Sequence, residues 1–328
     1  MAKKLNWGLL STARINRALI TPLRASKRNQ LLAVASRTQA SADAYAKEKK
    51  IARAHGSYEA LLADPEIDVV YISLPNHLHA EWTIKAVQAG KHVLCEKPLT
   101  LNADDVDAVG AAARNHGRVV MEAFMYRHHP QTLKVQEIVR SGSLGTLKLI
   151  RGSFSFVLSR AEDIRLLDPA MGGGSIWDIG CYPISYARSV LGQDPLDVFG
   201  WQVTGPTGID ETFVGQMKFA NDVLVQFDSS FTIPQHAFME IVGSEGTLSI
   251  PRPFKPEENE KIYLTRDDKT ETIKVKGQEL YIGEVENMAD AILLGHEPRI
   301  SLDDSLGNVR TITSLLESAR TGMPVQLS

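Results

Sequence analysis

The first 125 residues alternate short apolar runs with helical patterns, and this alternation constrains the fold more than any other feature. The apolar runs are rich in Val, Leu and Ile and lack polar alternation, which is typical of strands buried on both faces. Such strand–helix alternation predicts a parallel sheet of Rossmann type with right-handed crossovers. The predicted strands are 6–10, 30–35, 69–75, 92–96 and 119–124, and the predicted helices are 15–25, 40–50, 78–89 and 104–115.

After residue 125 the pattern becomes that of hairpins. Strand-like runs pair across short polar turns at 212–219 with 223–231, 238–242 with 247–250 and 262–266 with 270–275, which indicates antiparallel strands. Helices are predicted at 132–139, 285–294 and 302–319, and the proline-rich stretch 251–260 is expected to be an exposed loop. The chain is therefore predicted to be α/β, with a Rossmann domain over 1–125 and an α+β domain on a large, mostly antiparallel sheet over 126–328.

Composition narrows the functional classes. The 328 residues allow two domains, and 36 Lys+Arg against 39 Asp+Glu give a net charge of −3, too balanced for a chain dedicated to nucleic acid phosphates. Two cysteines, Cys95 and Cys181, are too few for a disulfide framework and favour a reducing compartment. No signal-like or membrane-spanning apolar run is visible. We therefore expect a cytoplasmic protein that binds neither nucleic acid nor membrane.

The turn after the first strand is a candidate pyrophosphate site. Ser11, Ala13 and Asn16 stand where a dinucleotide fold usually has its three glycines. Ser and Ala are small enough for close approach if their φ stays negative, and free N–H groups at the following helix would face a phosphate. An ordinary strand–helix turn is the alternative. The proposed contacts in this turn are Ser11, Thr12, Ala13, Arg14 and Ile15.

The end of the second strand discriminates between cofactors. NAD enzymes place an acidic residue about 20 residues after the fingerprint, but this chain has Ser36 and Arg37 there. A hydroxyl and a guanidinium attract a 2′-phosphate that a carboxylate would repel. The spacing therefore favours NADP, unless Arg37 is simply a solvated surface residue.

The loops after the third and fourth strands should face the same ligand edge. His77 and His79 lack further ligands for a metal and are better interpreted as lining the cofactor groove. Lys97, followed by Pro98, could stabilise negative charge developing on a substrate oxygen during hydride transfer; a surface lysine paired with Glu96 is the alternative. The cofactor contacts predicted in these loops are Leu74, Pro75, Asn76, His79, Glu96 and Lys97.

Several motifs resemble the Gfo/Idh/MocA oxidoreductase family. They are Glu-Lys-Pro at 96–98 after Ala-Gly-Lys-His-Val-Leu-Cys, Asp-Pro-Glu-Ile-Asp-Val-Val-Tyr-Ile at 64–72, Pro-Asn-His-Leu-His at 75–79 and Gly-Gly-Gly-Ser-Ile-Trp-Asp-Ile-Gly at 172–180. Within the family, residues 122–127 and 163–166 look like the branch of NADP-dependent D-xylose (aldose) 1-dehydrogenases and trans-dihydrodiol dehydrogenases.

The resemblance implies roles for three residues. Lys97 corresponds to the catalytic lysine of the family and Asp178 to the aspartate that orients the substrate, and Tyr182 stands where many members have His. Tyr182 could be the acid/base, since a nearby ammonium lowers a phenol pKa from its usual value of about 10. Pro183 predicts a kink or a helix start here. The alternatives are a core tyrosine for Tyr182 and a helix N-terminal charge for Asp178.

The resemblance also implies a reaction. We expect hydride transfer between NADP and C1 of an aldose, giving a lactone, with a dihydrodiol dehydrogenase, a dicarbonyl reductase, an aldose–aldose oxidoreductase or an NADP-sensing regulator as alternatives. Members often form dimers or tetramers through the open face of the second sheet, so a homo-oligomer is expected. Further candidate substrate contacts are Phe124, Arg127, Phe154, Asp163, Arg165 and Tyr281.

Overall fold

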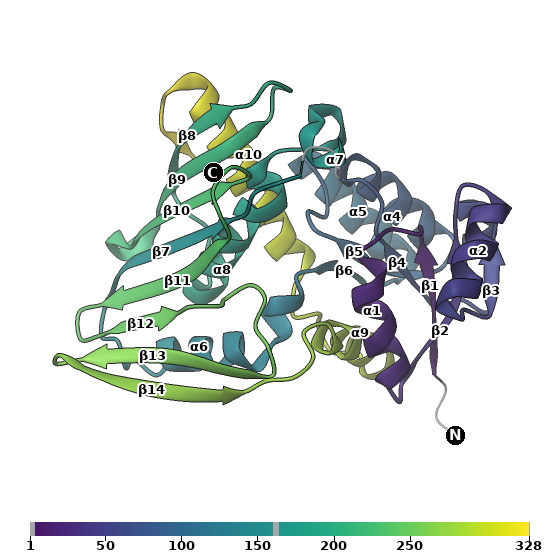
Figure 1. Cartoon of the computed structure of the whole chain (residues 1–328), viewed down its shortest axis with the longest axis horizontal. Helices are drawn as coiled ribbons and strands as arrows, with labels where there is room; N and C mark the ends of the chain where they lie inside the picture. The colour runs from purple at the N-terminus through teal and green to yellow at the C-terminus, as the bar shows by residue number, and fades with distance from the viewer. Residues whose placement is uncertain (1–3, 160–163, 328) are drawn as a thin grey trace. The chain divides into compact units, whose positions relative to one another are not determined.

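A six-stranded parallel sheet forms from the N-terminal alternation in the computed structural model (Figure 1), which describes residues 4–159 and 164–327. Its strand order is β3-β2-β1-β4-β5-β6, the Rossmann order, in which ligands bind where the order reverses beside β1. The prediction of a Rossmann-type parallel sheet is confirmed. The strands are β1 (Leu5–Leu10), β2 (Asn29–Ala35), β3 (Arg53–His55), β4 (Val69–Ile72), β5 (His92–Glu96) and β6 (Val120–Ala123).

The helices between these strands lie close to their predicted positions. Elements β3 and α3 were not predicted from the sequence, because three and five residues are too few to carry a periodic pattern. The helices are α1 (Asn16–Ala25), α2 (Gln39–Lys49), α3 (Tyr58–Leu62), α4 (His79–Gln88) and α5 (Ala103–His116), with short 3₁₀ turns at Asn76–Leu78 and Met125–His128.

The first compact unit also takes in a segment from late in the chain. It comprises residues 1–128 together with Tyr281–Leu306, whereas the second unit comprises His129–Leu280 and Gly307–Ser328. Helix α9 (Ile282–Leu294) packs against α1, and the Arg28 guanidinium lies 2.6 Å from the Asp290 carboxylate. The sequence pattern predicted this segment as part of the second domain, because a helical pattern does not reveal which sheet the helix covers.

The second unit is built on a nine-stranded sheet of order β14-β13-β12-β11-β7-β10-β9-β8-β15. Only the β7–β10 pair is parallel; the other seven pairs are antiparallel, as predicted. The strands are β7 (Leu147–Ser155), β8 (Asp197–Thr204), β9 (Asp210–Lys218), β10 (Leu224–Ser230), β11 (His236–Gly243), β12 (Thr247–Ile250), β13 (Asn259–Arg266), β14 (Lys269–Lys276) and β15 (Val325–Gln326).

One face of the nine-stranded sheet is covered by helices. A π-helical turn, Ile176–Gly180, leads directly into α8 (Cys181–Leu191), and both contact β7 and β10. Pro183 therefore lies in the first turn of α8, but the helical segment as a whole begins earlier, at Ile176. The kink or helix start predicted near Pro183 corresponds to the change from π-helical to α-helical geometry between Gly180 and Cys181. The other helices are α6 (Pro130–Arg140), α7 (Ile164–Leu167) and α10 (Leu302–Thr321), with 3₁₀ turns at Pro169–Met171 and Ala220–Asp222.

The stretch 251–260 is only partly the exposed loop that was expected. It is irregular up to residue 258, but the Phe254 side chain is 1% exposed. The prolines around Phe254 hid this core residue, since an irregular segment carries no periodicity to mark an inward position. In the part of the chain that the structure describes, no helix is both long and apolar enough to cross a bilayer.

Candidate functional site

A hydrogen-bond network holds the turn after β1. The Ser11 Oγ lies 2.7 Å from the Ser73 Oγ and accepts from the Ala13 N–H at 3.1 Å. The Ser73 hydroxyl donates to the Asn16 Oδ1 at 2.6 Å, and the Asn16 Nδ2 donates back to the Ser11 carbonyl at 2.8 Å. The φ of Ser11 is +150°, which corrects the expectation of a negative φ at this position. Side-chain hydrogen bonds thus support a turn that other dinucleotide folds build from glycine.

The backbone of this turn fits an anion. Among the described residues, nothing accepts a hydrogen bond from the N–H groups of Thr12, Arg14 and Ile15, which precede the first helical residue, Asn16. The N-terminal amides of a ten-residue helix carry partial positive charge, and the exposed Arg14 adds a cation. The turn can therefore bind a pyrophosphate.

The end of β2 carries the predicted 2′-phosphate residues. Ser36 is buried and Arg37 is exposed, and Arg37 makes no hydrogen bond or ion pair with any residue that the structure describes. Thr38 caps α2 by accepting from the Ser41 N–H at 3.2 Å. A guanidinium beside a helix N-terminus can receive a phosphate without breaking an existing contact.

His79 joins the two loops that were predicted to contact the cofactor. Its Nδ1 lies 2.7 Å from the Pro98 carbonyl oxygen and its Nε2 lies 2.7 Å from the Leu74 carbonyl oxygen. The ring is 1% exposed and so ties these loops together. Asn76 is buried beside it, while Pro75 is partly exposed and His77 exposed. Among the described residues, no cluster suited to a metal ion is found.

Lys97 is partly exposed at the end of β5, and the Lys97–Pro98 peptide bond is cis. Two carboxylates fix its surroundings. The Tyr71 hydroxyl donates to Glu96, and the buried Glu122 accepts from the Leu99 N–H at 2.9 Å. Burial, then the neighbouring Glu96, raises the pKa of Tyr71, which keeps the Tyr71 hydroxyl protonated as a donor. Glu122 belongs to the 122–127 motif that resembles the family branch, but this contact with Leu99 was not predicted from the sequence.

Asp178 and Tyr182 lie on the continuous helical segment from Ile176 to Leu191. Asp178 is the one partly exposed residue of the π-helical turn. The Tyr182 ring is 5% exposed and lies edge-on to Phe154 at 5.3 Å and tilted to Phe254 at 5.6 Å between centroids. Phe154 stacks on Phe254 at 5.0 Å. These three rings form an aromatic cluster, of which Phe254 is the member that was not predicted from the sequence.

The other predicted substrate contacts occupy varied environments. Arg127 is buried and its guanidinium lies 2.8 Å from Asp304, while Phe124 packs edge-on against Tyr126. Arg165 is exposed in α7, and Tyr281 precedes α9. Asp163 lies outside the described residues. Their roles toward a substrate stay predictions.

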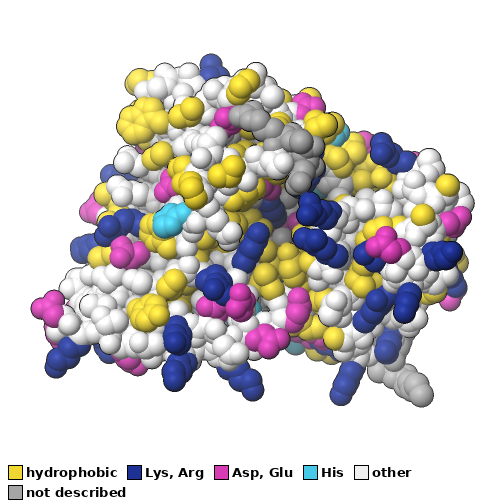
Figure 2. Space-filling view, viewed as in Figure 1, with side chains coloured by type: hydrophobic (Ala, Val, Ile, Leu, Met, Phe, Trp, Pro, Cys, Tyr) yellow, Lys and Arg dark blue, Asp and Glu magenta, His cyan; other side chains and the backbone are white. Residues whose placement is uncertain are grey.

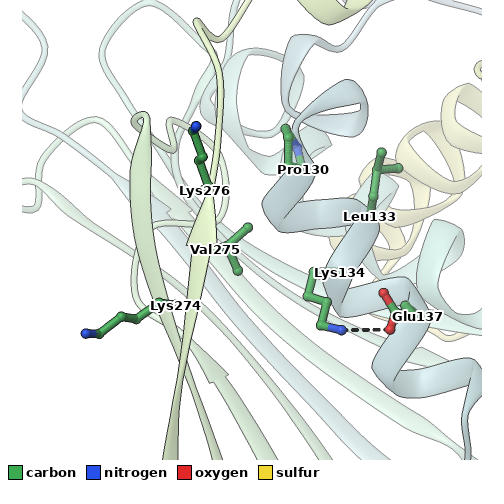
Figure 3. A pocket seen from close by; sticks show the side chains of 7 residues that line it. All are labelled: Pro130, Leu133, Lys134, Glu137, Lys274, Val275 and Lys276. Carbon is green, nitrogen blue, oxygen red and sulfur yellow. Dashed lines mark hydrogen bonds and ion pairs between the residues drawn. The ribbon is translucent and has the colours of Figure 1, made fainter.

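A hollow of about 330 Å³ lies between α6 and β14 (Figure 3). Val275 points toward α6, and Lys134 is paired with Glu137 at 2.7 Å. None of the predicted site residues lines this hollow. It is therefore separate from the candidate site described above.

Comparisons with known proteins converge on one family. Residues 5–124 match the model of the oxidoreductase family with an NAD-binding Rossmann fold, and residues 132–249 match the GFO/IDH/MocA C-terminal domain. A D-xylose 1-dehydrogenase (NADP(+)) of Haloferax volcanii is 39% identical over 98% of this chain and 99% of its own length. A trans-1,2-dihydrobenzene-1,2-diol dehydrogenase of Danio rerio is 35% identical over 75% of this chain and 74% of its own.

Two solved structures have the same fold throughout. An aldose–aldose oxidoreductase from Caulobacter crescentus complexed with glycerol has a TM-score of 0.92 and 25% identity, covering 99% of this chain and all of its own. A 3-ketoreductase from Actinomadura kijaniata in complex with NADP has a TM-score of 0.87 and 28% identity, covering 96% of this chain and 98% of its own.

Proposed function

The chain belongs to the Gfo/Idh/MocA oxidoreductase family, and from that premise we propose that it is an NADP-dependent dehydrogenase oxidising C1 of an aldose to a lactone. The observation that carries the proposal is the 39% identity, over nearly the full length of both chains, to an NADP-dependent D-xylose 1-dehydrogenase. Lys97, Asp178 and Tyr182, the residues that the family resemblance marks as catalytic, are all present.

The residues present fit NADP. The free amides of Thr12, Arg14 and Ile15 would hold the pyrophosphate, and Ser36 and Arg37 would hold the 2′-phosphate. When bound, the nicotinamide supplies the two-electron acceptor for the C1–H bond. Leu74, Asn76 and the Glu96–Lys97 segment, tied together through His79, would complete the binding surface.

Tyr182, Lys97 and Asp178 then have separate roles in moving the proton and orienting the sugar. Tyr182 takes the proton of the C1 hydroxyl as the C1–H bond is oxidised, so that a carbonyl forms and the sugar becomes a lactone. Lys97 stabilises the negative charge that develops on that oxygen and favours the tyrosinate. Asp178 accepts a hydrogen bond from the sugar and orients it. Among the solved structures of the Actinomadura kijaniata enzyme are variants in which a lysine or a tyrosine is replaced. These are the same two residue types that we propose for the acid/base chemistry here.

The experiment is a steady-state screen of pentoses, hexoses and cyclic trans-diols with NADP and, in parallel, NAD. We expect NADPH formation, followed by the absorbance of the reduced nicotinamide, with at least one aldose and with NADP preferred. A protein that binds NADP normally but oxidises no aldose or diol would defeat the proposal. Reduction of dicarbonyls, or a preference for trans-diols, would support a dihydrodiol dehydrogenase as the second candidate, which the similarity to the Danio rerio enzyme favours.

An aldose–aldose oxidoreductase and an NADP-sensing regulator would each give a distinct result. Nicotinamide absorbance in the purified protein, with one sugar reduced as another is oxidised, would indicate an aldose–aldose oxidoreductase, as the similarity to the Caulobacter crescentus structure suggests. Cofactor binding without turnover of any substrate would instead indicate a regulator.

Replacing Arg37 with alanine is expected to raise the Kd for NADP about 10–100-fold, since charged hydrogen bonds to a phosphate contribute about 1.5–3 kcal/mol. The Kd for NAD should change less than about threefold, because NAD lacks the 2′-phosphate. Cofactor titration by fluorescence measures both. Arg24→Ala, at the far end of α1, is the control. Equal weakening of NADP and NAD would contradict this role.

The open face of the nine-stranded sheet supports a homo-oligomer. Trp201, Val203, Val214 and Leu224 are 58%, 63%, 43% and 51% exposed, and Trp201 pairs with Val214 across β8 and β9. Figure 2 shows hydrophobic side chains over the region where β8, β9 and β10 lie. Apolar clusters of this kind mark protein interfaces.

We therefore expect Trp201→Asp to convert a dimer or tetramer into smaller species, because a carboxylate would be desolvated within the apolar contact. Sedimentation velocity measures the change. Lys261→Asp on β13 alters an exposed residue of the same sheet and is the control. A monomeric wild-type protein would contradict the prediction.

A further inference from the structure

We infer that Asp210 is a positioning residue that fixes the N-terminal end of the helical segment carrying Asp178 and Tyr182. The inference rests on the proposed function, which gives those two residues their roles. Asp210 is the first residue of β9 and belongs to none of the motifs found in the sequence. Its carboxylate does not need to touch the substrate, because it acts on the backbone that presents the catalytic side chains.

The contacts of Asp210 converge on the start of the π-helical turn. Its Oδ2 accepts from the Ser175 hydroxyl at 2.7 Å and from the Ile176 N–H at 2.7 Å. Ile176 begins the turn and has no partner for its N–H within it. A carboxylate from a strand thus satisfies an orphan helical amide that no local side chain caps, in the position where negative charge is favourable.

The fit around this carboxylate is tight. A Cβ added to Gly174 would overlap the Asp210 Oδ1, and Gly174 has a φ of +122°. The Gly174 carbonyl in turn accepts from the Asp178 N–H at 3.1 Å. The Asp210 carboxylate is therefore linked to Asp178 through Gly174, which lies against Asp210 and accepts the hydrogen bond from Asp178. The last glycine of the 172–174 run is required here for space and for φ, which gives that run a structural reason.

A second contact holds the other side of the turn. The Ser175 Oγ lies 3.0 Å from the Ser229 Oγ, and the backbone of Gly180 approaches the same Ser229 hydroxyl so closely that a Cβ would clash. Ser175, Ser229 and Asp210 thus clamp the π-helical turn at both ends. π-helical turns are found often at functional sites.

The ionised carboxylate of Asp210 is a poor choice for a residue whose only role is to stabilise the fold. The side chain is 4% exposed, and burial raises its pKa to about 6 despite the hydrogen bonds from Ser175 and the neighbouring amides. A raised carboxylate pKa means that folding disfavours the charged form, so at about pH 8 the ionised Asp210 lowers stability relative to a neutral group. Neutralising the group while keeping an acceptor oxygen, as Asp210→Asn does, should therefore cost little stability at this pH.

The experiment compares Asp210→Asn and Asp210→Ala with the wild-type holoenzyme at about pH 8, where the Asp210 carboxylate is ionised. The matched control is Asp228→Asn, whose carboxylate also accepts from a serine, Ser153, at 2.6 Å. On β7, Gly152 lies next to Pro183 and Phe154 next to Tyr182, so both face α8. Side chains alternate along a strand, so Ser153, between them, and its partner Asp228 face away from α8.

We expect kcat for the sugar to fall about 10-fold in Asp210→Asn and about 100-fold in Asp210→Ala, since small misplacements of catalytic groups have effects of this size. The Kd for NADP should stay within about twofold, because the cofactor contacts lie on other elements, and the Tm of Asp210→Asn should stay close to that of the wild type. Hydrogen exchange of the peptide spanning 175–180 should accelerate in both variants and stay unchanged in Asp228→Asn.

Wild-type kcat together with wild-type exchange in Asp210→Asn would overturn the inference, as would a lowered Tm with parallel loss of NADP binding, which assigns Asp210 to general stability. If the wild-type protein oxidises no sugar, the proposed function fails first. The exchange comparison, which needs no substrate, then decides alone whether Asp210 fixes the turn.

Discussion

Tyr182→Phe is expected to lower kcat for sugar oxidation about 10²–10⁴-fold, the usual contribution of a positioned general acid or base. The substitution removes only the hydroxyl. The ring packing against Phe154 and Phe254, at 5.3 and 5.6 Å, can therefore persist. The Kd for NADP and the Tm should change little. Steady-state kinetics with NADP and the best aldose of the screen, beside fluorescence titration of the cofactor, measure these quantities.

The matched control is Tyr186→Phe. Tyr186 lies one turn further along α8, is fully buried and packs edge-on against Phe254 at 6.2 Å. Its substitution removes a hydroxyl from the same helix and should leave kcat within a few-fold of the wild type. Equal losses in both variants would mean that the hydroxyls act through packing, and Tyr182 would no longer be the acid/base.

The sequence predicts those parts of this molecule that depend on local pattern. Buried parallel strands have uninterrupted apolar runs, so the predicted strand 92–96 matches β5 residue for residue. The turn after β1 was predicted as a pyrophosphate site from its position in the sequence, although other residues stand where such turns usually have glycine. Its hydrogen-bond support could not be predicted from the sequence, because Ser73 lies 62 residues from Ser11 and only the register of β1 beside β4 brings them together.

The parts that were not predicted from the sequence depend on long-range packing. Phe254 joins an aromatic cluster from an irregular loop, and Asp210 reaches Ser175 across 35 residues. Residues 281–306 have the helical pattern that was predicted but join the first unit. Periodicity identifies a helix and its apolar face but not the surface that the face covers. Assigning such residues needs the fold.

Lys97→Ala is expected to lower kcat for the sugar at least about 10³-fold while the Kd for NADP stays within about fivefold, because an ammonium that stabilises charge only in the transition state contributes to kcat rather than to binding. Lys85→Ala, on an exposed lysine paired with Glu81 in α4, should be indistinguishable from the wild type. An NADP-sensing regulator would bind the cofactor equally well with or without Lys97 and would show no turnover to lose.

The proposed coupling of Lys97 and Tyr182 also predicts a pH dependence and a double-variant effect that the two kcat losses alone do not test. If Lys97 favours the tyrosinate of Tyr182, Lys97→Ala should move the ascending, acid-side limb of the kcat profile to higher pH, since the phenol pKa then returns toward its usual value of about 10. If so, the double variant Lys97→Ala/Tyr182→Phe should be scarcely slower than the worse single variant, because losses at residues that act together are not additive. Strictly additive losses would separate the two side chains and leave Tyr182 without the cation on which its role depends.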